Sequence, residues 1–110
     1  MMTIVVQEQY VNVLAAFGDL QAAIDAAVRR YALEQMTAKI TALRDKDKAY
    51  QARYGMTYPA FAQQTAEDEA FVRRVETTIT KLWEHDLADW EFCYKGVQDW
   101  TQTLQNILLA

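Results

Sequence analysis

Turn-forming residues are scarce in this chain, whose 110 residues include three Gly and one Pro. Gly and Pro provide the backbone conformations that most tight turns need, and a many-stranded sheet needs many such turns. A few long helices need far fewer. The scarcity therefore predicts a mainly α-helical fold, and the length allows one modest core rather than two ordinary domains.

Composition and charge narrow the class of protein further. Hydrophobic residues make up 52% of the chain, which excludes disorder on composition, and the formal net charge of −4 gives no overall attraction to a phosphate backbone. The single cysteine, Cys93, cannot form an internal disulfide, which indicates a reducing compartment. The start of the sequence does not read as a signal peptide, and no apolar run is long enough to cross a membrane. We expect a cytoplasmic protein with no membrane partner.

One segment reads as a β-strand, the β-branched run Thr3, Ile4, Val5 and Val6. An isolated strand cannot satisfy its own backbone donors and acceptors, and the chain offers no second candidate strand. A second copy of the protein is the simplest source of a pairing strand. The sequence therefore predicts an intertwined homodimer whose subunits pair through this strand.

Helical periodicity begins after the strand. A first helix is expected from about Glu8 to Phe17, ended by Gly18, with Asp19 as the N-cap of the next helix. Apolar residues then recur every three or four positions up to Gly55, and an unbroken helix of that length would extend roughly 50 Å. Its second half should lean on another chain or on the C-terminal region, or the helix should bend within residues 44–48.

The second half of the chain also reads as helical. Thr57 is a plausible cap for a new helix that has Pro59 in its first turn, and Thr65 is a plausible cap before a run of acidic residues. Residues 66–108 form one helix or two, with a break near residues 85–89 or at Gly96.

Catalytic and metal-binding chemistry finds little support. His85 and Asp89 share one helical face but supply two ligands where a stable metal site needs three or more, so we interpret their surroundings as a solvated charged turn. Cys93 lacks an activating histidine and lies on an apolar stripe, which indicates a buried packing thiol. We expect no enzyme, no cofactor, no metal and no small-molecule substrate. An enzyme with an acidic site at His85, Asp86 and Asp89 is the third-ranked alternative.

Aromatic residues gather in the second half of the chain. A core this small can hardly bury three tryptophans at about 200 Å² each, and exposed aromatic residues often anchor protein interfaces. The sequence leaves two roles open for these aromatic residues: burial in a dimer core, or contact with a different partner. The candidate partner-binding residues are Tyr54, Met56, Tyr58, Phe61, Trp83, Trp90, Tyr94 and Trp100.

The first third of the chain, TIVVQEQYVNVLAAFGDLQAAIDAAVRRYALEQ, resembles the ribbon-helix-helix family. The short strand, the first helix, the turn at Gly18 and a second helix with the pattern LxxAIxxAVRRY occupy the places that the family uses. The resemblance implies a dimer in which two strands pair. It also implies a shared dimer core, formed by Leu20, Ile24, Val28 and Tyr31.

The remainder is similar to the tails of small bacterial antitoxins, which are encoded beside small toxins. The segments that carry this resemblance are RYGMTYPAF at residues 53–61 and HDLADWE at residues 85–91. The resemblance implies a tail that docks on a partner toxin. One departure concerns DNA: neither face of the strand carries Arg or Lys, and Arg29 and Arg30 lie too far along the second helix to replace them. DNA is therefore a doubtful partner.

These observations predict a ribbon-helix-helix-like dimerisation region with an extended second helix at residues 1–54. A helical partner-binding region would follow at residues 55–110. The preferred function is that of an antitoxin or regulatory protein that dimerises and binds a partner. Toxin neutralisation is its specific form, and weak DNA-binding autoregulation is a secondary one. The alternative is a helical homo-oligomeric scaffold or adaptor with neither a toxin partner nor DNA binding.

Overall fold

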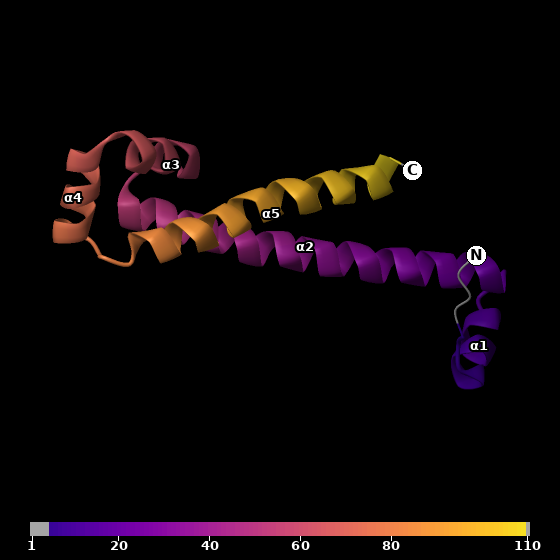
Figure 1. Ribbon diagram of the computed structural model, residues 1–110. Helices are drawn as coiled ribbons and strands as arrows, with labels where there is room; N and C mark the ends of the chain where they lie inside the picture. Colours follow the sequence, from indigo (N-terminus) through magenta and orange to yellow (C-terminus); the bar gives the residue numbers. More distant parts are fainter. Residues whose placement is uncertain (1–4, 110) are drawn as a thin grey trace. The chain divides into compact units, whose positions relative to one another are not determined.

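The computed structural model describes residues 5–109 and is mainly α-helical, as predicted (Figure 1). Its five helices are α1 (Glu8–Ala15), α2 (Leu20–Tyr54), α3 (Tyr58–Glu67), α4 (Glu69–Thr78) and α5 (Trp83–Leu109). No strand occurs among the described residues. Of the predicted strand, Thr3 and Ile4 lie outside that range, and Val5 and Val6 are non-helical and unpaired in the single chain.

The chain divides into two compact units, residues 1–35 and residues 36–110. The first unit contains α1 and the beginning of α2. Gly18 has a φ of 117°, a left-handed conformation that glycine adopts without steric cost, and it ends the α1 segment as expected. The Asp19 carboxylate accepts a hydrogen bond from the Ala22 backbone N–H at 3.2 Å, which confirms the predicted N-cap of α2.

Helix α2 runs for 35 residues without a break, including residues 44–48, where a bend was the alternative expectation. The second half of α2 instead lies along α5, the partner expected from the C-terminal region (Figure 1). Lys46 and Asp47, inside the charged stretch, both bond to α5 side chains. Both side chains reach α5 from a regular helical backbone, so these contacts are compatible with an unbroken helix through the charged stretch.

Gly55, with a φ of 71°, ends α2 and reverses the chain into α3. Thr57 occupies the N-cap position of α3, although its side chain makes no capping hydrogen bond. The expectation that Thr65 caps a later helix is wrong, because Thr65 lies inside α3 and its hydroxyl donates to the Phe61 carbonyl at 3.0 Å. Asp68 is the actual cap of α4 and accepts from the Phe71 N–H at 3.1 Å.

The break in the C-terminal region falls at residues 79–82, between α4 and α5, and not at residues 85–89 or at Gly96. Both predicted positions lie inside α5. Gly96 remains helical where α5 passes close to α2: a Cβ added there would lie 2.8 Å from the Leu43 Cδ1 atom. The absence of a side chain at Gly96 thus serves helix packing rather than a turn.

The core of the second unit draws on four helices. Tyr54 of α2, Phe61 of α3, Phe71 and Val75 of α4, and Trp90 of α5 form one buried cluster. Further along the α2–α5 pair, the buried apolar residues are Met36, Ile40, Leu43 and Cys93. This unit therefore buries an aromatic cluster and a further set of apolar side chains within a single chain.

Candidate protein-interaction site

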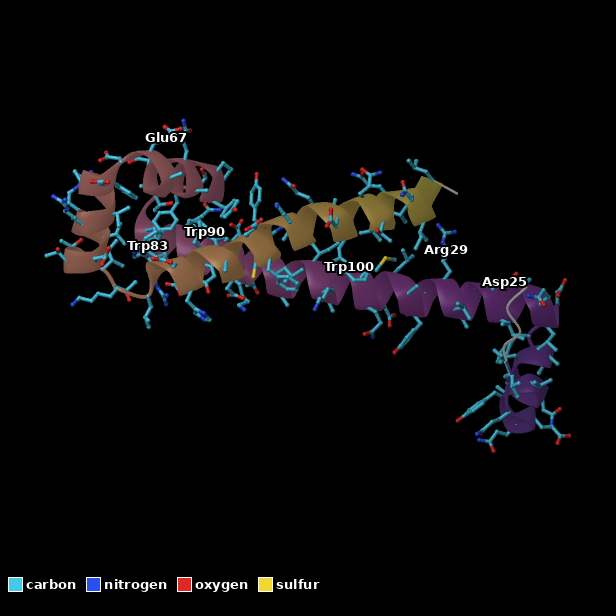
Figure 2. The ribbon with its side chains drawn as sticks, viewed as in Figure 1. Asp25, Arg29, Glu67, Trp83, Trp90 and Trp100 are labelled. Atoms are coloured by element: carbon cyan, nitrogen blue, oxygen red, sulfur yellow. The ribbon has the colours of Figure 1, made fainter. Side chains whose placement is uncertain are left out.

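Trp90 is the centre of the aromatic core in the second unit and is fully buried (Figure 2). Its ring lies 5.4 Å from the Phe61 ring, 5.6 Å from that of Tyr50 and 5.8 Å from those of Tyr54 and Tyr58. These separations fall within the range in which aromatic pairs attract each other beyond the burial of their area. The indole therefore joins α2, α3 and α5.

This packing corrects part of the predicted partner surface. Tyr54, Phe61 and Trp90 are buried in the chain's own core and present no surface to a partner. These rings are buried because four helices meet around them, and helix periodicity alone did not indicate that the four helices would meet there. Four other predicted residues, Met56, Tyr58, Trp83 and Tyr94, are partly buried against the same cluster. Trp100, 38% exposed, is the predicted tryptophan that remains open to solvent.

Asp86 is a buried carboxylate at the start of α5 that binds two side chains of α2. It accepts hydrogen bonds from the Tyr54 hydroxyl at 2.5 Å and from the Arg53 guanidinium at 2.6 Å. Burial, followed by the bond to Asp86, raises the pKa of the Tyr54 hydroxyl, and the same carboxylate raises the pKa of Arg53. A buried charge is tolerated when it is paired and hydrogen-bonded in this way.

A second carboxylate, Asp89, repeats the arrangement one helical turn later. It accepts from the Tyr50 hydroxyl at 2.5 Å and lies 3.1 Å from the Lys46 ammonium. These two contacts, the tyrosine bond first, hold the pKa of Asp89 below its ordinary value. A third hydrogen bond has its donor on α5 and its acceptor on α2: the Trp90 indole N–H donates to Asp47 at 2.7 Å.

We call these eight side chains the α2–α5 polar network: Lys46, Asp47, Tyr50, Arg53, Tyr54, Asp86, Asp89 and, through its indole N–H, Trp90. The sequence reading missed it, and the interpretation of residues 85–89 as a solvated charged turn is wrong for Asp86 and Asp89. A signal was present, because the α2 members recur at helical spacing and face acids that stand three apart on α5. His85, directly before Asp86 in the sequence, is exposed.

Two features bear on chemistry at this site. Among residues 5–109, no group of three or more His, Cys, Asp or Glu side chains is placed to hold a metal ion. Cys93 is fully buried, as predicted, and burial raises the pKa of its thiol. A buried thiol with a raised pKa is a poor nucleophile.

The first unit has a different surface: none of its described residues is buried. Of the predicted dimer core, Leu20 and Ile24 are half-buried, while Val28 and Tyr31 are exposed, Tyr31 by 64%. Phe17, just after α1, is 81% exposed. Large apolar side chains gathered on one segment usually mark an interaction surface.

The second unit carries an apolar groove of about 420 Å³, which we call the α5 groove. Leu43 of α2 is its buried floor, and the exposed rings of Phe92 and Trp100 border it. Phe92 was not among the predicted partner residues. The remaining lining residues are Ala88, Glu91, Lys95, Gly96 and Asp99.

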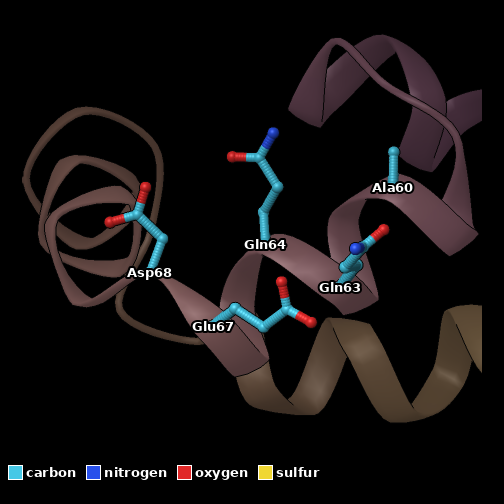
Figure 3. A pocket seen from close by; sticks show the side chains of 5 residues that line it. All are labelled: Ala60, Gln63, Gln64, Glu67 and Asp68. Carbon is cyan, nitrogen blue, oxygen red and sulfur yellow. The ribbon is translucent and has the colours of Figure 1, made fainter.

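A further depression lies on α3 and is polar (Figure 3). Its lining residues are Ala60, Gln63, Gln64, Glu67 and Asp68. The Asp68 carboxylate is already engaged as the cap of α4. With no apolar floor, this depression lacks the mixture of apolar wall and few polar groups that ligand pockets usually have.

The fold and its surfaces define a mainly α-helical protein with one unit that encloses its own core and one unit that does not. The chain matches no family model, no curated protein and no solved structure. No single described helix is long and apolar enough to span a membrane, although α1 and α2, bent by 108° at their junction, pass that test together.

Replacing the buried acceptor tests the polar network. Asp86→Ala leaves the buried Tyr54 hydroxyl without its acceptor, and we expect the free energy of unfolding to fall by about 1–3 kcal/mol. Urea denaturation followed by circular dichroism measures this. Glu84→Ala is the matched control, because Glu84 is an exposed acid in the same turn of α5, and its effect should stay within about 0.5 kcal/mol. Equal losses in the two variants would contradict the role given to Asp86.

Acidification tests Asp89 separately. The pKa of Asp89 in the folded chain is lower than the unfolded value of about 3.9. The ionised Asp89 carboxylate therefore stabilises the fold above about pH 3.9, and this contribution disappears as the pH falls through the folded pKa. We expect Asp89→Asn to be less stable than the wild type at about pH 7 and to lose less stability between about pH 5 and pH 3. Parallel pH profiles for wild type and variant would rule out this linkage.

Proposed function

We propose that this protein is an antitoxin-like regulatory protein of the cytoplasm. It forms a homodimer through its first unit and neutralises a small toxin by binding it through its second unit. The observation that carries the proposal is the apolar face of the first unit, which no described residue of that unit covers. The sequence resemblances identify the two partners. The ribbon-helix-helix resemblance implies a second copy of the chain, and the antitoxin resemblance implies a toxin.

The first unit has too little internal contact to be stable alone. Helix α1 has eight residues, and isolated helices shorter than about 12–15 residues are marginal in water. It buries no residue, while Tyr10 and Val13 are 55% and 59% exposed. A second copy that covers these side chains would supply the missing apolar burial, at roughly 25 cal/mol for each Å² removed from water.

The ribbon-helix-helix arrangement is the specific form of dimer that we propose. Val5 is 92% exposed and non-helical, so its backbone is free of helical hydrogen bonds and accessible to a strand from a second copy. Leu20, Ile24, Val28 and Tyr31 would then build the shared core, as the resemblance implies. DNA remains a doubtful partner because the segment from Val5 to Glu8 carries no positive charge.

The second unit favours a protein partner over a small molecule. It encloses its own core, so the apolar side chains that it exposes, including Phe92 and Trp100, are surplus to folding. Surplus aromatic residues on a rigid helix are typical anchors of protein interfaces. A homo-oligomeric scaffold is the second candidate, favoured if the same aromatic residues meet further copies of the chain.

Charge in the first unit tests the dimer. Phe17→Glu places a carboxylate on the exposed apolar face, and we expect the dimer to dissociate at low micromolar concentration because that charge would have to be desolvated at the interface. Val5→Pro, which removes a backbone donor needed for strand pairing, should act in the same direction. Sedimentation equilibrium measures the association. Leu82→Glu, at an exposed apolar position of the second unit, should leave the dimer intact.

Co-expression with the product of the adjacent gene tests toxin binding. With a tag on this chain alone, we expect a stable heterocomplex to be recovered by affinity purification and gel filtration. A truncation after Arg53 should lose the partner, since it removes most of the second unit. Recovery of this protein alone, as a uniform homo-oligomer, would instead favour the scaffold.

A further inference from the structure

The α5 groove combines an apolar interior with an unbalanced charge at its edge, and it belongs to neither the buried core nor the polar network. We propose that it is the docking site for a helix or extended segment of the partner protein that inserts an aliphatic or aromatic side chain next to an Arg or Lys. This inference rests on the proposed function, because it names the chemistry by which the second unit would recognise its partner.

The interior of the groove is shaped by a repeat along α5. Ala88, Phe92, Gly96 and Trp100 follow each other at intervals of four residues, which places them in one row on the helix surface. The two small residues alternate with the two large rings. Leu43 of α2 already occupies the place that a Gly96 side chain would take, so the open space of the groove lies above Leu43 and is bordered by the two rings. Leu43 closes the bottom of that space.

Exposure sets this row apart from the core aromatics. Phe92 is 64% exposed, whereas Trp90, two residues earlier, is fully buried. Figure 2 shows Trp90 within the group of core side chains and Trp100 further along α5, beside α2. Tryptophan is among the residues most enriched at the energetic centres of protein interfaces, where burial of its large ring on binding yields most of the affinity.

A second row on α5 provides the charge. Glu91, Lys95 and Asp99 also follow at intervals of four and line the groove. Lys95 is paired with Glu91 at 2.6 Å, whereas Asp99 forms no ion pair with any residue in the described part of the chain. Two acids and one base leave one unbalanced negative charge, whose complement is a cation on the partner. An Arg or Lys there could also lie over the Trp100 ring.

The same charge argues against a second copy as the occupant. The exposed apolar face of α1 is the obvious segment that another copy could offer, but α1 carries Glu8 and no Lys or Arg. Placing that segment in the groove would bring an acid towards an edge that already has an excess of acids. A separate protein with a basic, apolar segment therefore fits better.

Binding measurements on groove variants test the inference. The probe is the purified product of the adjacent gene, titrated by calorimetry into full-length wild type, Phe92→Ala, Trp100→Ala and Asp99→Asn. We expect Kd to rise by about 30-fold or more for each aromatic replacement, the size typical of an interface hot spot. For Asp99→Asn we expect a rise of several-fold that disappears at high salt, because ion pairs at an interface rim are screened.

Two control variants make the same kinds of replacement outside the groove. Leu82→Ala removes an exposed apolar side chain and Glu84→Gln an exposed charge, both in the second unit, and both should bind within twofold of the wild type. Circular dichroism of every variant must show the wild-type helical fold. Trp100→Ala is expected to unfold at a somewhat lower temperature than the others, because the Trp100 side chain is only 38% exposed.

The outcomes separate this inference from the proposed function. A heterocomplex that forms with wild-type affinity in all three groove variants would overturn the groove as the docking site and leave toxin binding intact. Weakened self-association of Phe92→Ala and Trp100→Ala, with unchanged partner affinity, would assign the groove to a second copy and overturn the inference. No heterocomplex with any form of the chain would refute the proposed function itself, and the inference with it.

Discussion

The bond between Asp86 and Tyr54 is the contact on which the second unit depends. It places a carboxylate from the first turn of α5 against a buried hydroxyl at the last residue of α2, and so fixes where the two helices meet. Asp89 with Tyr50, one turn away, fixes the rotation of α5 about its axis. Because hydrogen bonds require defined distances and angles, these pairs specify a register that apolar packing alone leaves loose.

Once that register is set, Trp90 can face inward with both of its requirements met. Its ring contacts aromatic rings of α2 and α3, and its indole N–H donates to Asp47 at 2.7 Å. A buried tryptophan usually needs such a polar partner. The same rotation turns Phe92 to solvent and directs Gly96 towards Leu43, so the core and the groove are two results of one helix orientation.

The sequence predicted those features of the fold that depend on neighbours in the chain. The helical class, the ends at Gly18 and Gly55, and the cap at Asp19 follow from local backbone preferences, and all are confirmed. The position of the α4–α5 break, the burial of Asp86 and the burial of Trp90 were missed. The last two depend on which face of α5 meets α2, a pairing between residues more than thirty positions apart that periodicity does not encode.

The two units differ in what completes them. The second unit satisfies its buried carboxylate, Asp86, and encloses an aromatic cluster, so its core is formed within one chain. The first unit buries none of its described residues and exposes Phe17 and Tyr31, so the proposed homodimer would supply apolar burial that this unit lacks. Such a dimer would couple the folding of the first unit to the concentration of the chain, since binding stabilises the folded form by mass action. The core of the second unit and the α5 groove are both formed within one chain, so the groove would not depend on the proposed dimer.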